Sequence, residues 1–341
     1  MSAAAPVSRA VVALISLAGA ALAAAWYGAQ ERRDKALQRA FIAFHENIRH
    51  ERFGEQELLR SRRDALSAEL KVLADGVRTR TFDQGSYSMG TGVKPLAGEF
   101  DIDIGLVLDC ETTYFKDPVE AKLLVRDALK RGSRRLRVRR SCITVYYTQK
   151  DYGDFHVDLA VYARGKDGRL HLAKGKPRSD EENRVWEPAA PEELTKLVDE
   201  KASGEERAQF KRCIRYLKRW KHVNFKTKAP FSIALTMAAF HWFEPRLEGL
   251  VNATANDTDA MRALVQKMLT LMGHGRLHVQ LPVAPSVDLM EGMTPKQMSD
   301  FRLKLERLRD ALTLASEAED TDVAVRALRN QFGAEFGGAL A

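Results

Sequence analysis

The sequence predicts an α+β fold, with a small mixed sheet between an N-terminal helix and a helical C-terminal half. Three observations support this: apolar residues at helical spacing before Val77, alternating apolar and polar residues at 101–109, and renewed helical spacing after Pro191. The chain has 341 residues, of which 45% are hydrophobic and 29% are charged. That composition excludes a disordered or collagen-like protein.

Changes of composition along the chain predict three parts. Residues 1–33 form a hydrophobic N-terminal extension, residues 34–190 form a core that holds the sheet and a long N-terminal helix, and residues 191–341 form a helical domain. The segment from Lys174 to Pro191 contains three prolines, so we expect an irregular connector there.

The extension contains a candidate transmembrane helix at Ala10–Ala29. These twenty residues carry no charge, and their number matches the length of a membrane-spanning helix. Arg32 and Arg33 follow the stretch, and a basic flank on that side places the bulk of the chain in the cytoplasm. Nine of the twenty residues are alanine, however, so the drive for insertion is modest. A membrane anchor, an export signal cleaved after Ala25 and a dispensable extension all remain open.

The core begins with a helix and then changes to strands. Helical spacing runs from Asp34 to about Val77, with Gly54 as a candidate break. Alternation at 102–109 predicts a strand. Two runs rich in β-branched and aromatic residues predict a hairpin, and an Asp-Gly pair predicts a further tight turn. These segments are 141–147, 155–162 and Asp167-Gly168.

Helices are predicted throughout the C-terminal half. Thr294, Pro295 and Gln297 have the arrangement of a capping box with proline at the first helical position. The predicted helices are 205–222, 232–243, 258–272 and one that begins at Pro295.

Charge and cysteine content narrow the class of protein. There are 54 Lys and Arg against 46 Asp and Glu, a net charge of +8, which suits phosphate-rich partners such as nucleotides, nucleic acid or anionic lipid. Cys110, Cys142 and Cys213 are odd in number and widely spaced, which argues against a disulfide framework or a zinc ribbon. We therefore expect reduced cysteines in a cytosolic protein.

One group of residues has a pattern that points to chemistry. Asp101 and Asp103 alternate with apolar residues, so on a strand both carboxylates project from the same face. Neighbouring carboxylates repel each other, a divalent cation relieves the repulsion, and oxygen ligands suit Mg²⁺ or Mn²⁺. Asp158, within another apolar run, is a candidate third carboxylate. Gly85 and Ser86 predict a turn whose N–H groups and hydroxyl can approach a phosphate.

This joint pattern resembles the polymerase-β-like nucleotidyltransferases. The segment GSYSMGTGVKPLAGEFDIDIGLVLD resembles the cGAS/DncV-like branch, the bacterial cyclic-oligonucleotide synthases. The resemblance runs from about Leu37 to Phe336, and the extension before Arg32 departs from it. Further segments that resemble this branch are FHVDLAVYA, CIRYLKRWK, PFSIALTMAAF and LPVAPSVDLMEGMTPKQMSDF. The resemblance implies a polymerase-β-like nucleotidyltransferase core, with a helical half that closes a cleft over nucleotide.

The resemblance also implies a role for each candidate residue. Asp101, Asp103 and Asp158 would be catalytic and would bind the metals, and Asp158 would help to activate the attacking ribose hydroxyl. On charge alone, the basic helix at 205–222 is instead a solvated surface, and Ser232 is an N-cap. The nucleotide-binding residues implied by the resemblance are Gly85, Ser86, Lys218 and Ser232.

The implied function is synthesis of a cyclic di- or trinucleotide second messenger from nucleoside triphosphates, with pyrophosphate release, in anti-phage signalling. Because those substrates are cytosolic, we expect a cytoplasmic location, free or anchored to the inner membrane. The stretch Ala10–Ala29 is then not a cleaved export signal, and the anchor and the dispensable extension remain open. Two alternatives remain: an enzyme that adds nucleotides to an RNA or protein acceptor, and an inactive, basic, membrane-tethered binding module.

The C-terminal tail raises a further expectation about partners. Residues 334–341 are mostly small, with a glycine pair, so we expect this tail to pack poorly and to be accessible. Some synthases of the resembled branch are conjugated through their last residue by ubiquitin-like machinery, which makes Ala341 a candidate for the same modification.

Overall fold

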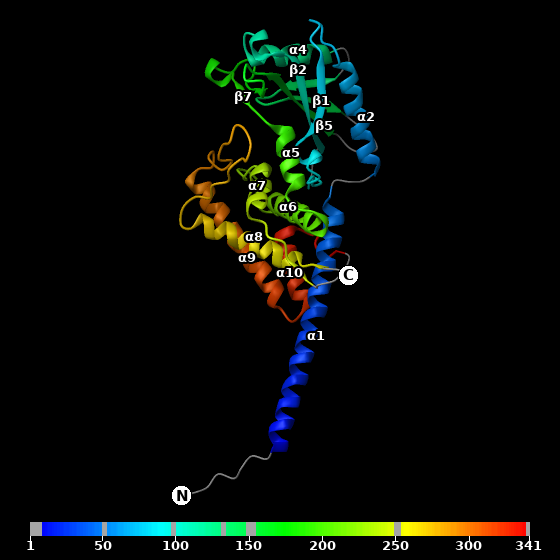
Figure 1. Ribbon diagram of the computed structural model, residues 1–341, viewed down its shortest axis with the longest axis vertical. Coiled ribbons are helices and arrows are strands. Elements are labelled where there is room, and N and C mark those ends of the chain that lie inside the picture. The colour runs from blue at the N-terminus through cyan, green and yellow to red at the C-terminus, as the bar shows by residue number, and fades with distance from the viewer. Residues whose placement is uncertain are drawn as a thin grey trace.

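The structure is a computed structural model that describes residues 9–49, 53–96, 100–130, 134–147, 155–248 and 254–338. Figure 1 shows a sheet with its covering helices at one end of the molecule and a group of packed helices next to it. The predicted α+β fold, with a small mixed sheet and a helical C-terminal half, is confirmed.

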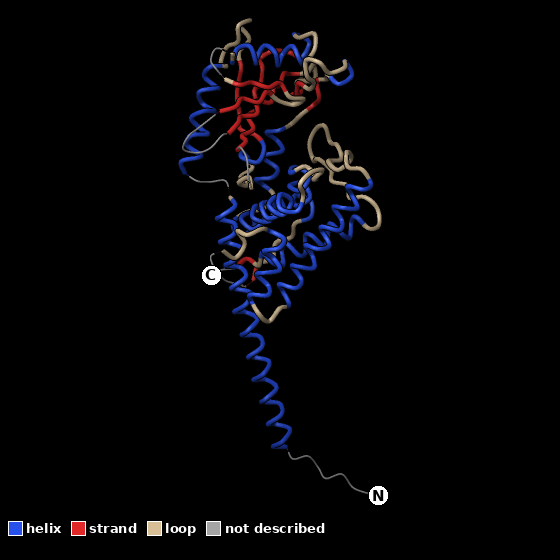
Figure 2. The backbone as a smooth tube through the Cα atoms, turned by 180° about the vertical axis from the view of Figure 1, so that it is seen from behind, coloured by secondary structure: helices blue, strands red, loops and turns tan. Residues whose placement is uncertain are grey.

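The strands of the sheet are red in Figure 2. Their order is β1-β2-β5-β4-β3, and β6 and β7 extend the sheet from β5. Strands β2 and β5 run parallel, whereas the other described pairs of this sheet are antiparallel. The strands are β1 (Thr79–Gln84), β2 (Phe100–Glu111), β3 (Arg135–Val138), β4 (Ile143–Tyr147), β5 (Phe155–Arg164), β6 (Leu170–Ala173) and β7 (Trp186–Pro188).

Helices precede, interrupt and follow the sheet. A separate two-stranded sheet, β8 (Leu247–Glu248) with β9 (Thr254–Ala255), lies within the helical half. The helices are α1 (Arg9–Ile48), α2 (Phe53–Glu69), α3 (Gly85–Ser88), α4 (Pro118–Leu129), α5 (Pro191–Glu200), α6 (Gly204–Asn224), α7 (Ser232–Trp242), α8 (Asp257–Met272), α9 (Pro295–Glu317) and α10 (Thr321–Phe332), with short 3₁₀ turns η1 (Thr112–Tyr114) and η2 (Glu181–Asn183).

The two faces of the sheet have different environments because side chains alternate along each strand. Ile102 and Ile104 of β2 are at most 3% exposed and belong to a core shared with Leu66 of α2 and Val125 of α4. The acidic residues of β2 occupy the alternate positions and therefore lie on the opposite face. The predicted alternation of this strand is confirmed.

Several local predictions are confirmed, and one is wrong. Strands β4 and β5 form the predicted antiparallel pair, although the turn that contains Gly153 lies outside the described residues. The capping box is present, since Thr294 Oγ1 accepts from Gln297 N and Gln297 Oε1 accepts from Thr294 N. The predicted break at Gly54 is misplaced, because α1 ends at Ile48 and α2 begins at Phe53. Gly54 therefore lies in the first turn of α2, where backbone N–H groups have no intrahelical partner.

The C-terminal part of α1 packs into the core of the helical half. Phe41 and Phe44 are fully buried, and their rings lie 5.0–6.0 Å from those of Tyr216, Phe332 and Phe336. The expectation of a poorly packed tail is therefore wrong as far as Phe336, because an aromatic side chain gains more by burial than its small neighbours lose in freedom. Residues 339–341 lie outside the described part of the chain.

The basic face of α6 is buried rather than solvated. Arg212, Arg215, Lys218 and Arg219 are at most 6% exposed. The solvated interpretation of this helix is therefore wrong for these four side chains. Burial of so many cations requires compensating oxygens from other elements.

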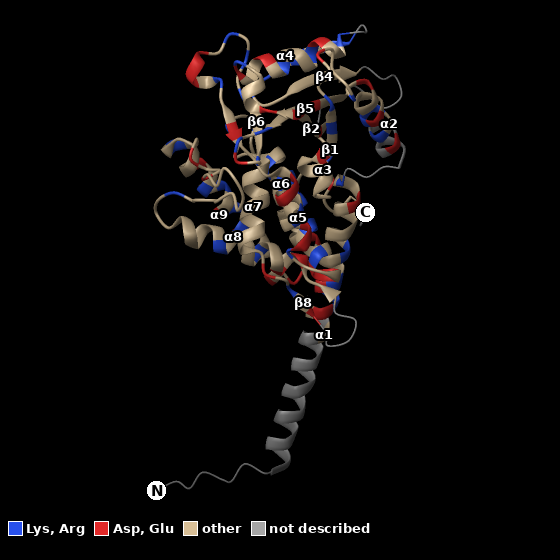
Figure 3. Ribbon diagram, turned by 45° about the horizontal axis from the view of Figure 1, so that its top comes forward, with Lys and Arg blue, Asp and Glu red and all other residues tan. Residues whose placement is uncertain are grey.

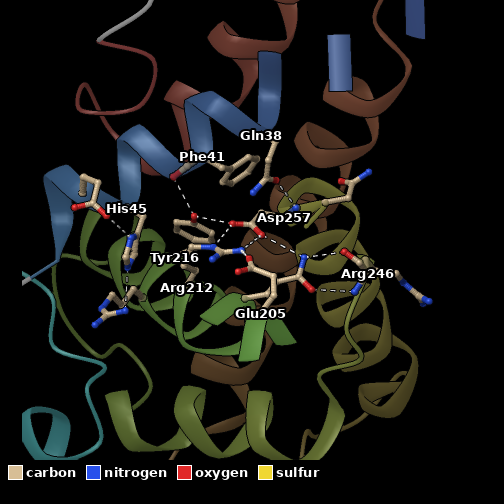
Figure 4. Close-up of polar contacts among 12 residues, drawn as sticks. Gln38, Phe41, His45, Glu205, Arg212, Tyr216, Arg246 and Asp257 are labelled. Atoms are coloured by element: carbon tan, nitrogen blue, oxygen red, sulfur yellow. Dashed lines mark hydrogen bonds and ion pairs between the residues drawn. The ribbon is translucent and has the colours of Figure 1, made fainter. Parts of the chain in front are cut away.

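Asp257, the first residue of α8, compensates Arg212 (Figure 4). Arg212 of α6 binds its two carboxylate oxygens at 2.7 and 3.0 Å. The Tyr216 hydroxyl lies 2.9 Å from Oδ2, and Gln209 Nε2 donates to Oδ1 at 3.2 Å. The backbone N–H of Asp257 donates to Gln38 Oε1 of α1 at 2.8 Å. One fully buried carboxylate thus connects α1, α6 and α8.

No helix is both long and apolar enough to cross a membrane among the residues that could be searched. The side chains of the predicted span Ala10–Ala29 fall almost entirely outside the described residues, so the anchor stays a prediction. The three domain boundaries likewise stay predictions.

We predict that Asp257→Asn lowers the free energy of unfolding by about 3–5 kcal/mol, because the substitution leaves the buried Arg212 guanidinium without its counter-charge. Asp259→Asn, two residues further along α8, is the matched control. Asp259 pairs with Arg262 on the surface, so its replacement should cost less than about 1 kcal/mol. Urea denaturation measures both, and equal losses would contradict the assigned role of Asp257.

We predict that His45 makes the protein acid-sensitive. Burial, followed by the charges of Arg215 and Arg212, lowers the pKa of His45 to about 3. The folded state therefore holds this imidazole neutral, and its contribution to stability is complete above pH 6.5 and is lost as the pH falls from about 6.5 to about 3, by at most about 1.4 kcal/mol per pH unit.

The test compares denaturation midpoints of the wild type and His45→Gln over that pH range. Glutamine cannot titrate, yet it can still accept a hydrogen bond from Arg215, which lies 2.9 Å from His45 Nε2. The variant should lose stability less steeply in acid. The control is the exposed His274→Gln, which should keep the wild-type slope, and an unchanged slope in His45→Gln would refute the prediction.

Candidate active site

A cavity of about 250 Å³ lies between the sheet and the helical half. Six of the seven candidate residues line it, four from the sheet side and two from the helices. The seventh, Asp158, pairs with Asp103 on the neighbouring strand. From the sheet side the lining residues are Gly85, Ser86, Met89, Val93, Asp101 and Asp103, and from α6 and α7 they are Lys218, His222, Ser232, Ile233 and Thr236.

Three carboxylates share the face of the sheet that meets this cavity. Asp101 and Asp103 lie two residues apart on β2, and the parallel register places Asp103 directly beside Asp158 of β5. Asp158 Oδ1 accepts a hydrogen bond from Thr144 Oγ1 at 2.6 Å. The parallel pairing, which the sequence did not specify, is what brings the third carboxylate to the other two.

Asp103 shows the electrostatic consequence of this arrangement. Its burial, and then the charges of Asp101 and Asp158, raise the pKa of Asp103 to about 7, against a smaller opposing effect of Lys218. Nearby like charges and low solvation both disfavour the ionised form. The ionised triad therefore needs an added positive charge.

Gly85 allows the chain to approach Asp103 closely. It has a φ of +70°, which favours glycine, and a Cβ built on it would lie 2.1 Å from Asp103 Oδ2. The residue begins the single-turn helix α3, and Ser86 follows within the cavity wall. A side chain at position 85 would displace the carboxylate.

Lys218 faces the carboxylates from α6. Its ammonium group is buried and donates to Thr91 O at 3.1 Å and to Thr91 Oγ1 at 3.0 Å. Burial, followed by the charges of Arg215 and Lys221, lowers the pKa of Lys218 to about 7. An ammonium group has three donors, so one remains for a ligand in the cavity.

Ser232 is the first residue of α7 rather than its N-cap, which is Phe231. Its Oγ accepts a hydrogen bond from Lys221 Nζ at 2.5 Å. The N-cap interpretation of Ser232 is therefore wrong, because the serine is already inside the helix and its hydroxyl is available to the cavity.

Sequence reasoning missed His222 and Thr236, which also line the cavity. Each lies four residues after a predicted site residue on the same helix, Lys218 and Ser232 respectively, and such residues share a helix face. That spacing was the signal that could have identified them. Burial, and then the charges of Lys221, Arg219 and Lys218, lower the pKa of His222 to about 4, so a neutral imidazole faces the cavity.

The carboxylate oxygens at this site are suitable ligands for a divalent cation, but they fill only part of its coordination shell. Within the described residues, no three His, Cys, Asp or Glu side chains are arranged to hold a metal ion together. Asp101 and Asp103 alone offer carboxylate oxygens to the cavity, whereas Asp158 is engaged with Thr144. Two carboxylates completed by substrate phosphate oxygens and waters are an ordinary arrangement for Mg²⁺.

Comparison with known proteins identifies the class. Residues 79–162 match the family model described as the nucleotidyltransferase domain of cyclic GMP-AMP synthase DncV-like proteins. This segment contains the triad and the Gly-Ser turn, so residues 79–162 are similar to the nucleotidyltransferase domain of that family. A search of curated proteins found no match to the chain.

Solved structures of Vibrio cholerae DncV are similar in fold over most of the chain. The apo form is 18% identical, with a TM-score of 0.59 over 92% of this chain and 88% of that one. The cyclic AMP-GMP synthase in complex with the linear intermediate 5′ pppA(3′,5′)pG is 16% identical, with a TM-score of 0.61 over 92% and 89%. The complex with GTP and 5MTHFGLU2 is 17% identical, with a TM-score of 0.61 over 93% and 90%.

We predict that Gly85→Ala weakens ATP binding in addition to lowering the free energy of unfolding. Gly168→Ala is a matched control, since Gly168 also has a positive φ (+74°) but has open space where a Cβ would lie. Both variants should lose about 1–2 kcal/mol of unfolding free energy. Only Gly85→Ala should also weaken ATP binding, measured by calorimetry. Equal ATP affinities in the two variants would show that the contact with Asp103 is unimportant.

Proposed function

We propose that this protein is a metal-dependent nucleotidyltransferase that joins nucleoside triphosphates into a cyclic di- or trinucleotide and releases pyrophosphate, as a second-messenger synthase in anti-phage signalling. The observation that carries the proposal is that carboxylates and hydrogen-bond donors for phosphate line opposite walls of one cavity. Asp101 and Asp103 line one side, and Lys218 and Ser232 line the other. Phosphoryl transfer requires negative ligands for cations and positive or neutral donors for phosphate in one place.

The donors on the helical side would bind the triphosphate. Lys218 offers its remaining N–H, and the Ser232 hydroxyl lies on the same wall. On the opposite wall, Ser86 adds a hydroxyl at the Gly85 turn, where the absence of a side chain lets phosphate approach the backbone. These groups would hold the α-phosphate in line with an attacking hydroxyl.

The carboxylates would serve the metal and the proton. Asp101 and Asp103, with Asp158 beside them, would hold Mg²⁺ or Mn²⁺, which when bound would supply positive charge at the transferred phosphoryl group. Asp158 would accept the proton of the attacking ribose hydroxyl, a role for which its position beside Asp103 on β5 is suitable.

The cyclic product is supported by the fold shared with the cyclic AMP-GMP synthase from Vibrio cholerae. Cytoplasmic location is part of the proposal, because nucleoside triphosphates are cytosolic.

The test incubates purified protein with labelled nucleoside triphosphates and Mg²⁺. Phosphatase-resistant product would support cyclisation. Labelling that depends on added RNA or protein would instead identify an acceptor-directed transferase, and no turnover with intact fold would indicate a binding module.

We predict that Asp101→Asn and Asp103→Asn each lower turnover at least about a hundredfold, because each removes a charge that the transferred phosphoryl group depends on through the cation. Asp109→Asn is the matched control, since Asp109 is an exposed carboxylate on the same strand and does not line the cavity. Near-normal turnover in the Asp101→Asn, Asp103→Asn double variant would refute the assignment of these two carboxylates.

A further inference from the structure

A second cavity, of about 410 Å³, lies where α6 ends and α9 begins. It shares no lining residue with the candidate active site. Its lining residues are Asn224, Phe225, Lys226, Thr227, Lys228, Thr294, Lys296, Gln297, Asp300 and Lys304.

This cavity is strongly basic, with four lysines against one aspartate. Lys226, Lys228 and Lys296 have no hydrogen bond or ion pair with any described residue. The fourth, Lys304, donates to Asn224 O at 2.7 Å. Figure 3 shows acidic and basic residues interspersed along the ribbon, whereas lysines outnumber Asp300 in the lining of this cavity.

Two further features distinguish the cavity from an ordinary charged surface. Lys228 has a φ of +57°, a conformation that costs a residue with a side chain about 1–2 kcal/mol, so a lysine is present where glycine would be more stable. Phe225 adds an apolar wall, and its ring packs against Trp220 and Phe301 at centroid distances of 5.6 and 6.3 Å. Strain at a lysine and a fixed aromatic wall are features of a ligand site.

We propose that this second cavity binds an oligophosphate, either a nucleotide or free pyrophosphate. Its volume is within the range of small-molecule sites. Several ammonium groups around one hollow require a ligand with several negative charges, and lysines bind phosphate well as point charges. An aromatic wall next to them suits a nucleobase or sugar but is not needed for phosphate itself.

The proposal is independent of the catalytic one, because it concerns binding at residues outside the active-site cavity. The test therefore needs no turnover. Calorimetry of the full chain in buffer without divalent cations would measure the dissociation constants of pyrophosphate and of ATP.

The cavity variant is Lys226→Ala, Lys228→Gly, Lys296→Ala. Glycine at position 228 accepts the positive φ without strain, so this variant should fold at least as well as the wild type. The matched control is Lys71→Ala, Lys166→Ala, Lys267→Ala, which removes the same net charge from exposed lysines that line neither cavity.

The cavity variant should bind pyrophosphate at least about tenfold more weakly than the wild type, and the control should stay within about twofold. A larger loss of ATP affinity than of pyrophosphate affinity in the cavity variant would identify a nucleotide as the ligand of this cavity, and an equal or smaller loss would identify pyrophosphate. An equal loss in both triple variants, no loss in the cavity variant, or a preference for single-stranded oligonucleotides over both probes would overturn the proposal.

Discussion

The ion pair between Arg212 and Asp257 determines how the helical half is assembled. A buried carboxylate is costly unless it is paired and hydrogen-bonded, and Asp257 has both kinds of partner. Its contacts fix α6 against α8, and its backbone N–H fixes α8 against Gln38 of α1. Because α6 also carries Lys218 and His222, this pair sets the position of one wall of the candidate active site.

In the candidate active site, Asp103 and Lys218 lie on opposite walls, and the charged form of each is disfavoured. Burial and like charges raise the pKa of Asp103 to about 7, while burial and neighbouring cations lower that of Lys218 to about 7. The attraction between the two groups is present but smaller than these effects. An added cation on the acidic wall and an anionic phosphate on the basic wall would each restore the charged form, which is why such an arrangement is typical of a site that binds both.

Helix α4, strand β1 and the register between β2 and β5 were not predicted from the sequence, and each has a physical reason. Helix α4 had readable signals, because Asp117 accepts hydrogen bonds as its N-cap and Pro118 follows at the first position, yet its short apolar pattern was not recognised. Strand β1 has no clear alternation, since its residues are nearly all half-buried. Asp158 was expected near the other carboxylates, but only the parallel register of β2 and β5 places it beside Asp103.

The sequence by itself determined which residues share a face: the acidic positions of β2, the Gly85-Ser86 turn and the capping box at Thr294 all follow from local spacing and backbone chemistry. Only the tertiary structure decided which charged and aromatic side chains are buried. Lys218 looked solvated on charge alone, and its compensation comes from Thr91, 127 residues earlier. Phe336 looked like part of a loose tail, and its partners are Phe41 and Phe44 of α1. Local periodicity determines to which side of a strand or helix a side chain projects. The burial of a charge or a ring depends on partners that are distant along the chain.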